Sequence, residues 1–121
     1  MANTVDYYLS KGFDRLAAEY FASGRKRIIG VSANDDFTLT IRFDNGEQRL
    51  YDMRPYLKKG TVFEPFAKLE NFRRVYVDDT HAIAWDIDPN VDSKKVWSNK
   101  VDLSPDSCYL DSVPIGGVSR A

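Results

Sequence analysis

The sequence predicts a single α+β domain: a small antiparallel β-sheet built from two hairpin-like strand pairs, with N-terminal helices and short helices packed on it. Apolar residues recur at helical spacing within the first 25 of the 121 residues, and the spacing changes to two after Arg27. Asn45-Gly46, the strongest short-range hairpin signal, then follows an alternating segment. A chain of this length is typical of one domain with one core.

Residues 1–25 are predicted to form an N-terminal helical extension made of two helices. Apolar residues repeat there at three- and four-residue spacing: Val5, Tyr8, Leu9, Phe13, Leu16, Ala17, Tyr20 and Phe21. Gly12 can end a first helix in a left-handed conformation, and Asp14 can cap a second helix that Gly24 ends. The alternative is one continuous helix, which would lose about 1 kcal/mol to its interior glycine.

The core domain, residues 26–113, is predicted to begin with three strands at residues 28–31, 37–43 and 48–52. In the second strand apolar and polar residues alternate, so one face is buried and the other is solvated. A polar turn at residues 34–36 separates it from the first strand.

The loop length at Asn45-Gly46 decides which residues of this hairpin face the core. A two-residue loop places Leu50 opposite Ile41, whereas a three-residue loop with a bulge at Gly46 places Arg49 there. The two-residue register buries the more apolar side chain, and it is the register that we predict.

The second half of the core domain is predicted to contain short helical turns followed by a second strand pair, at residues 72–77 and 82–87. Residues 88–100 are polar and are expected to be irregular. Ser104-Pro105 is typical of a helix start. Residues 114–121 are expected to form a flexible tail.

One core is predicted from the inward positions of these strands. Its members are Ile41, Phe43, Leu50, Val75, Val77, Ile83 and Trp85.

Composition argues against several classes of protein. The chain has 17 basic and 18 acidic residues, whereas a nucleic-acid-binding domain usually has a basic excess. Its longest apolar stretches, such as residues 28–31, are too short to cross a membrane. Its single cysteine, Cys108, allows no internal disulfide and favours a reducing compartment. The start lacks the features of a signal peptide. We therefore expect a cytoplasmic protein with no membrane or nucleic-acid partner.

No catalytic residue is predicted. His81, the only histidine, lies in a predicted turn, and Cys108 lies in a predicted helix. A nucleophilic pair would need these side chains within hydrogen-bonding reach, and nothing in their spacing brings them together. The sequence instead favours a solvated turn histidine and a small buried thiol.

No metal or cofactor is predicted either. Asp86, Asp88, Asn90 and Asp92 alternate as the first ligands of a calcium loop do. Val91 stands where that loop needs glycine, and Trp97 stands where it needs a bidentate glutamate. We therefore interpret this segment as an acidic loop.

An interface is predicted at Arg42, Arg49 and Tyr51. In the two-residue register the two arginines face each other on the outer face of the hairpin, and like charges in that position need an anion. Asp44 and Glu47 could supply it within the chain, and a carboxylate of a partner protein could supply it from outside. Tyrosine and arginine are enriched at interfaces.

The order of motifs resembles a bacterial family catalogued as domain of unknown function 2442. The motifs are Leu39 to Phe43 followed by Asp44-Asn45-Gly46-Glu47, Tyr51-Asp52-Met53, Pro55, Phe63, Phe72, Val75-Tyr76-Val77-Asp78, Trp85, Val101-Asp102-Leu103-Ser104-Pro105-Asp106 and Tyr109. The resemblance implies a small antiparallel sheet with short helices, and no established activity or catalytic residue. Similar domains occur alone, fused to a helix-turn-helix unit, or encoded beside a second small protein in toxin–antitoxin-like pairs. Residues 86–100 and the N-terminal helices depart from the family pattern.

The leading hypothesis is a non-catalytic protein-interaction module of the bacterial cytoplasm. It would pair with itself, as a homodimer, or with a small partner protein in an antitoxin-like way. The alternative is a small-ligand-binding domain with an apolar pocket under Trp85 and Trp97, and an enzyme of unknown class comes third. A stable co-purifying protein would favour the first hypothesis, and a ligand-specific thermal shift the second.

Overall fold

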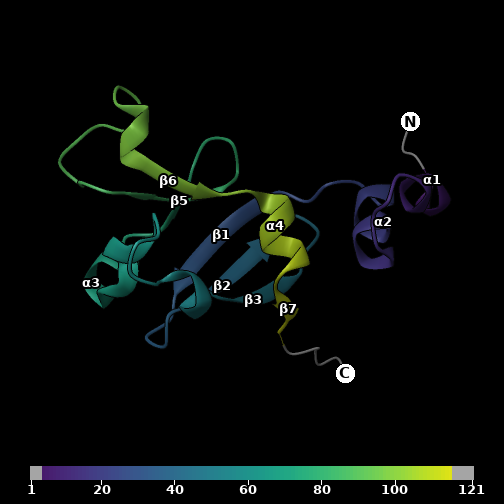
Figure 1. The fold of residues 1–121 in the computed structure, drawn as a ribbon, viewed down its shortest axis with the longest axis horizontal. Coiled ribbons are helices and arrows are strands. Elements are labelled where there is room, and N and C mark those ends of the chain that lie inside the picture. Colours follow the sequence, from purple (N-terminus) through teal and green to yellow (C-terminus); the bar gives the residue numbers. More distant parts are fainter. Residues whose placement is uncertain (1–3, 116–121) are drawn as a thin grey trace.

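The computed structural model describes residues 4–115, which form two antiparallel sheets and short helices (Figure 1). The first sheet has the order β1-β2-β3-β7, with strands Ile28–Ala33, Thr38–Phe43, Gln48–Asp52 and Val113–Pro114. The second has the order β4-β5-β6, with strands Tyr76–Val77, Ile83–Asp86 and Lys100–Leu103. The predicted α+β class is confirmed. The two predicted strand groups lie in separate sheets. The first sheet also contains β7 and the second contains β6, two strands that we did not predict.

The helical extension consists of two helices, as predicted. Helix α1 is Val5–Ser10 and α2 is Arg15–Ala22. The Asp14 carboxylate caps α2 by accepting a hydrogen bond from the amide of Ala17 at 2.8 Å. Gly12, between the helices, has a φ of +97°, a conformation that favours glycine.

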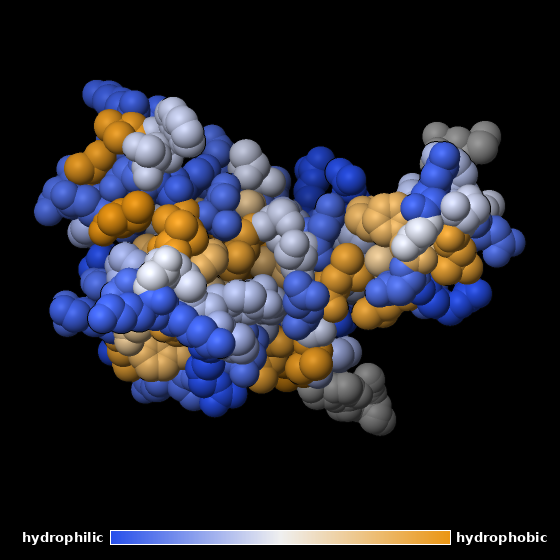
Figure 2. Space-filling view, viewed as in Figure 1, coloured by the Kyte–Doolittle hydropathy of each residue, from blue (hydrophilic) through white to orange (hydrophobic). Residues whose placement is uncertain are grey.

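Helices α1 and α2 form an arm that stands apart from the sheets (Figures 1 and 2). The arm contacts helix α4, Pro105–Leu110, through Tyr20. The Tyr20 hydroxyl donates to Asp106 at 2.5 Å, and its ring lies 4.9 Å from that of Tyr109. Helix α4 begins where it was predicted, with the side chain of Ser104 as its N-cap.

The segment between β3 and β4 contains helix α3, Leu69–Phe72, and two short 3₁₀ turns. A third 3₁₀ turn, Trp97–Asn99, precedes β6. The prediction that a strand begins at Phe72 is wrong, because this residue ends α3 and places its ring in the core.

The core lies between the inner face of the first sheet, the second sheet and the helices packed on them. Its buried members are Ile28, Leu39, Ile41, Phe43, Tyr51, Met53, Phe66, Phe72, Ile83, Trp85 and Cys108. Of the predicted core, Ile41, Phe43, Ile83 and Trp85 are confirmed. Val75 and Val77 are half-buried against it. The prediction for Leu50 is wrong.

Leu50 is outside the core because the β2–β3 hairpin has the other register. Ile41 lies opposite Arg49, so the predicted two-residue loop is wrong and the alternative with the bulge at Gly46 is observed. Gly46 has the φ of +90° that this turn requires. Arg49 and Tyr51 consequently face the core, and Leu50 points to the opposite side of the sheet.

Candidate functional site

The three residues predicted to form an interface do not share a face. Arg42 is exposed on the outer face of the first sheet, whereas Arg49 and Tyr51 are 7% and 3% exposed and face the core. The bulge at Gly46 shifts β3 by one residue relative to β2, and a shift of one residue moves every side chain to the other face. The predicted side-by-side arrangement is therefore wrong.

Arg49 is held inside the protein by the C-terminal segment. Its Nε donates to Ser112 Oγ at 2.7 Å, and its Nη2 donates to the Ser112 carbonyl at 2.8 Å. Its Nη1 pairs with Glu47 at 2.9 Å, and the guanidinium lies 4.2 Å from the ring centre of Tyr109. These contacts satisfy the buried charge and join the hairpin to β7, so Arg49 has a structural role.

Glu47 completes this cluster. Burial raises the pKa of its carboxyl, but hydrogen bonds from Tyr109, Asn45 and Arg49 outweigh that effect and hold the pKa below its usual value. Glu47 is therefore ionised at neutral pH and balances the charge of Arg49.

The predicted pocket between the two tryptophans is not formed. Trp85 is fully buried, and its Nε1 donates to the carbonyl of Phe72 at 3.0 Å. Trp97 is 82% exposed on the 3₁₀ turn that precedes β6. Because Trp85 has no accessible surface, it cannot line an open pocket with Trp97.

A surface cavity of about 490 Å³ lies instead beside Tyr76. Its lining includes Asp78, Ser93, Lys94 and Lys100. An adjoining cavity of about 420 Å³ shares Tyr76, Ser93 and Lys94. Side chains of both signs line this hollow, which is open to small polar molecules.

Asp78 is a buried anion at the edge of this cavity. One carboxylate oxygen accepts hydrogen bonds from Thr80 and from the amide of Ala82, and the other pairs with Lys100 at 2.9 Å. Burial raises the pKa of Asp78, but these bonds outweigh burial and lower the pKa to about 2, from 3.8. The ionised carboxylate therefore stabilises the β4–β5 turn.

We expect Asp78 to make stability depend on pH in acid. A group whose pKa is lower in the folded chain contributes stability above its unfolded pKa and loses it as pH falls through the folded pKa. Asp78 should therefore contribute about 2 kcal/mol above pH 4, lost between about pH 4 and pH 2. Urea unfolding of the wild type and of Asp78→Asn should show a stability difference that shrinks across this window. Asp79→Asn, in the same turn, is the control, and a constant difference for Asp78→Asn would contradict the prediction.

Cys108 and His81 do not form a reactive pair in this structure. Cys108 is a fully buried free thiol, and burial raises its pKa to about 12, opposite to the change that activates a nucleophile. His81 lies in a turn, as predicted, but it is half-buried with its Nδ1 3.3 Å from the carbonyl oxygen of Ile28. Cys108 packs in the core, and His81 contacts the backbone of β1.

Asn99 organises the acidic loop after β5 through side-chain hydrogen bonds. The Asn99 side-chain oxygen accepts a hydrogen bond from the Asp88 amide at 2.9 Å. Its Nδ2 donates to the Asp88 carbonyl at 3.1 Å and to the Ser93 hydroxyl at 2.9 Å. Asp86 accepts from Tyr76 and Ser93. Within residues 4–115, no cluster of three or more His, Cys, Asp or Glu could hold a metal ion.

Gly30 is a residue of the outer face that sequence reasoning missed. It lies within β1 opposite Arg42, and the Arg42 guanidinium covers it. A signal was present, because a glycine inside a predicted strand indicates a close approach of another group.

Comparisons with known proteins give one match. A family model described as "Protein of unknown function (DUF2442)" matches residues 28–112, from the first residue of β1 to the serine that holds Arg49. No curated protein and no solved structure matched the chain. In the part of the chain that the structure describes, no helix is long and apolar enough to span a bilayer.

Proposed function

The chain belongs to the DUF2442 family of proteins of unknown function, and from this premise we propose that it is a non-catalytic protein-interaction module. It pairs with another small protein, in an antitoxin-like way, in the bacterial cytoplasm. The observation that carries this proposal is the open outer face of the β1-β2-β3-β7 sheet.

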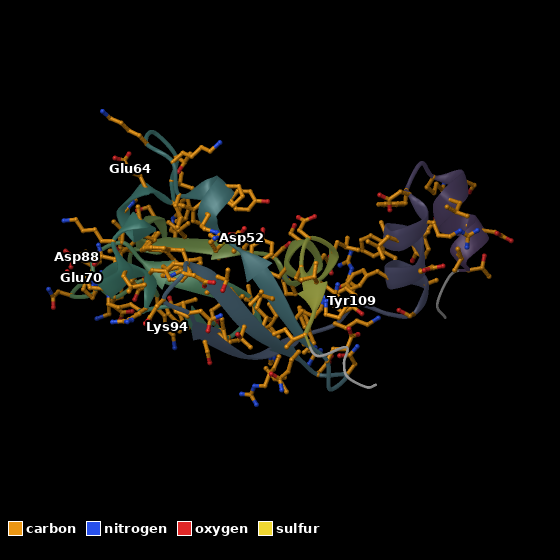
Figure 3. The ribbon with its side chains drawn as sticks, turned by 90° about the horizontal axis from the view of Figure 1, so that it is seen from below. Asp52, Glu64, Glu70, Asp88, Lys94 and Tyr109 are labelled. Atoms are coloured by element: carbon orange, nitrogen blue, oxygen red, sulfur yellow. The ribbon has the colours of Figure 1, made fainter. Side chains whose placement is uncertain are left out.

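Within residues 4–115, no helix lies on this outer face (Figure 3). Figure 3 shows α4 on one side of strands β1 to β3 and no helix on their other side. The face is lined by Ser32, Thr40, Arg42, Gln48, Leu50 and Val113. Val113 is 59% exposed, and Arg42 and Gln48 are also exposed. Residues on a rigid sheet are held in place better than residues on a loop, which suits a binding surface.

Two other parts of the surface carry exposed apolar side chains. The arm exposes Tyr7, Phe13 and Leu16, and the loop before β6 exposes Val96 and Trp97. Figure 2 shows apolar surface over both regions. The rings of the arm pack partly on one another, and the loop is hydrogen-bonded to β5 through Ser93 and Asp86. These regions serve as comparison sites for the outer face.

The proposal predicts that association depends on Val113 and not on equally exposed residues elsewhere. Val113→Asp should abolish complex formation, whereas Leu16→Asp and Trp97→Asp should leave it intact. Each change is made at a side chain at least 57% exposed, so folding should be retained. The measurement is cross-linking in cells at native expression level, followed by size-exclusion chromatography and mass spectrometry of the complex. Unchanged association of the folded Val113→Asp variant would contradict the proposal.

A second candidate function is the binding of a small polar ligand, and the cavity beside Tyr76 favours it. The hollow offers the hydroxyl of Ser93 and the ammonium groups of Lys94 and Lys100. A metabolite that raises the melting temperature of the wild type but not that of Lys94→Glu would support this function. Such a result, together with no complex in cells, would replace the interaction hypothesis.

A further inference from the structure

The Arg42 guanidinium lies over Gly30 on the outer face of the first sheet, in space that a side chain at position 30 would fill. The two residues are cross-strand partners in β1 and β2. A Cβ atom added to Gly30 would lie 2.8 Å from both Cζ and Nε of Arg42, closer than real Cβ contacts. Any side chain at position 30 would therefore push the guanidinium away. The absence of one lets the planar group rest on the backbone of β1.

Arg42 has no anion to balance it within residues 4–115. Arg49, Arg54 and Arg73 each form an ion pair with a carboxylate, whereas Arg42 forms neither an ion pair nor a side-chain hydrogen bond with the described residues. Asp52 lies on the same face, but both of its oxygens are occupied by Arg54. Within the described residues the Arg42 guanidinium is thus open to a ligand from outside.

We propose that Gly30 and Arg42 form a seat for a carboxylate side chain, aspartate or glutamate, of the partner protein. This inference rests on the proposed function and specifies its chemistry. A guanidinium presents two parallel N–H groups that match a carboxylate. Charge complementarity to an unpaired arginine selects an acidic partner.

The surroundings of the seat define the rest of the partner surface. Gln48 lies beside Arg42 on β3, and Thr40 and Leu50 form the next row of the sheet, followed by Val113. An acidic side chain over Arg42 would therefore have an apolar neighbour over Leu50 and Val113. A single unpaired cation here does not supply the concentrated positive field that nucleic acid requires.

Gly30→Ala is the most specific variant for this inference. Gly30 does not have a positive φ, so alanine fits the strand, and the clash is with the movable end of Arg42. Gly30→Ala keeps the charge and displaces it, Arg42→Lys keeps the charge without the two-pronged geometry, and Arg42→Ser removes both. All three should melt close to the wild-type temperature.

The probe is a phage-displayed library of random dodecapeptides selected on the wild-type protein. We expect enrichment of peptides that combine Asp or Glu with an apolar residue. A selected peptide should bind Gly30→Ala and Arg42→Lys about tenfold more weakly than wild type, and its own Glu→Gln version should lose a similar factor. The measurement is fluorescence anisotropy at two salt concentrations.

Several results would overturn the inference. Selected peptides without acidic residues, or acidic peptides that bind all three variants like the wild type, would exclude the seat. Dimerisation of the wild type in sedimentation experiments, lost in Arg42→Ser, would assign the seat to a second copy of the chain. If Val113→Asp abolishes the complex in cells while Gly30→Ala and Arg42→Ser do not, the proposed function stands and the carboxylate seat fails.

Discussion

Replacing Trp85 with alanine is expected to lower the free energy of unfolding by about 3–5 kcal/mol, because the indole fills the centre of the core. Trp85 is fully buried, with its ring 5.3 Å from that of Phe66 and 6.0 Å from those of Phe63 and Phe72. Removing the ring leaves a cavity among these aromatic side chains that a close-packed interior cannot refill.

Trp97 provides the matched control for this prediction. It is 82% exposed, so Trp97→Ala should change stability by no more than about 0.5 kcal/mol. The stability loss of Trp85→Phe should lie between those of Trp85→Ala and Trp97→Ala, because phenylalanine keeps an aromatic ring but loses the hydrogen bond to the Phe72 carbonyl. That carbonyl also accepts from the amide of Val75 at 3.3 Å, so it is not left unpaired. Urea unfolding, analysed with one m-value for all variants, measures the three changes in the free energy of unfolding. Equal losses for Trp85→Ala and Trp97→Ala would contradict the burial of Trp85 in the core.

The elements that the sequence predicted well are those determined by local interactions. Asp14 and Ser104 cap helices through amides three residues further along the chain, and Gly12 takes a left-handed conformation between two short helices. Each signal lies within a few residues of the feature that it predicts. The alternation in β2 likewise placed Ile41 and Phe43 in the core.

The register of the hairpin could not be predicted from local pattern. Burial of Leu50 favours the two-residue loop, but two hydrogen bonds of the inward-facing Arg49 go to Ser112, which lies 63 residues away. The same turn closes the hairpins at residues 34–38 and 78–82, where Phe37 and His81 take the position with positive φ. In these two turns no glycine marks that position.

Strands β6 and β7 were missed because tertiary contacts create them. Lys100–Leu103 becomes a strand by pairing with β5, and Val113–Pro114 pairs with only two residues of β3. The incorrect side-by-side arrangement of the three predicted interface residues followed from the incorrect register, since one residue of shift exchanged Leu50 for Arg49 and Tyr51 on the inner face. Arg42 alone keeps its predicted place on the outer face.

Arg49 and Arg42 are consequently expected to respond very differently to the same substitution. Arg49→Ser should lower the free energy of unfolding by about 3–5 kcal/mol, because it removes a buried charge and leaves its partner Glu47 uncompensated. It also removes both hydrogen bonds to Ser112, which tie the C-terminal segment to β3. Arg42→Ser should change stability by no more than about 0.5 kcal/mol, since Arg42 is exposed and unpaired among the described residues.

Arg49→Lys separates the charge of Arg49 from its geometry. Lysine keeps the pairing with Glu47 but cannot make both bonds to Ser112 from one ammonium group, so about 1–3 kcal/mol should be lost. Hydrogen exchange should then rise first at the amide of Ile115, which bonds to the Gln48 carbonyl at the end of the β3–β7 pairing. If Arg49→Ser were as stable as Arg42→Ser, the inward position of Arg49 would be wrong. The result would then support the two-residue register, in which both arginines lie on the outer face. The two single variants, compared by urea unfolding, therefore test the register on which the carboxylate seat at Arg42 depends.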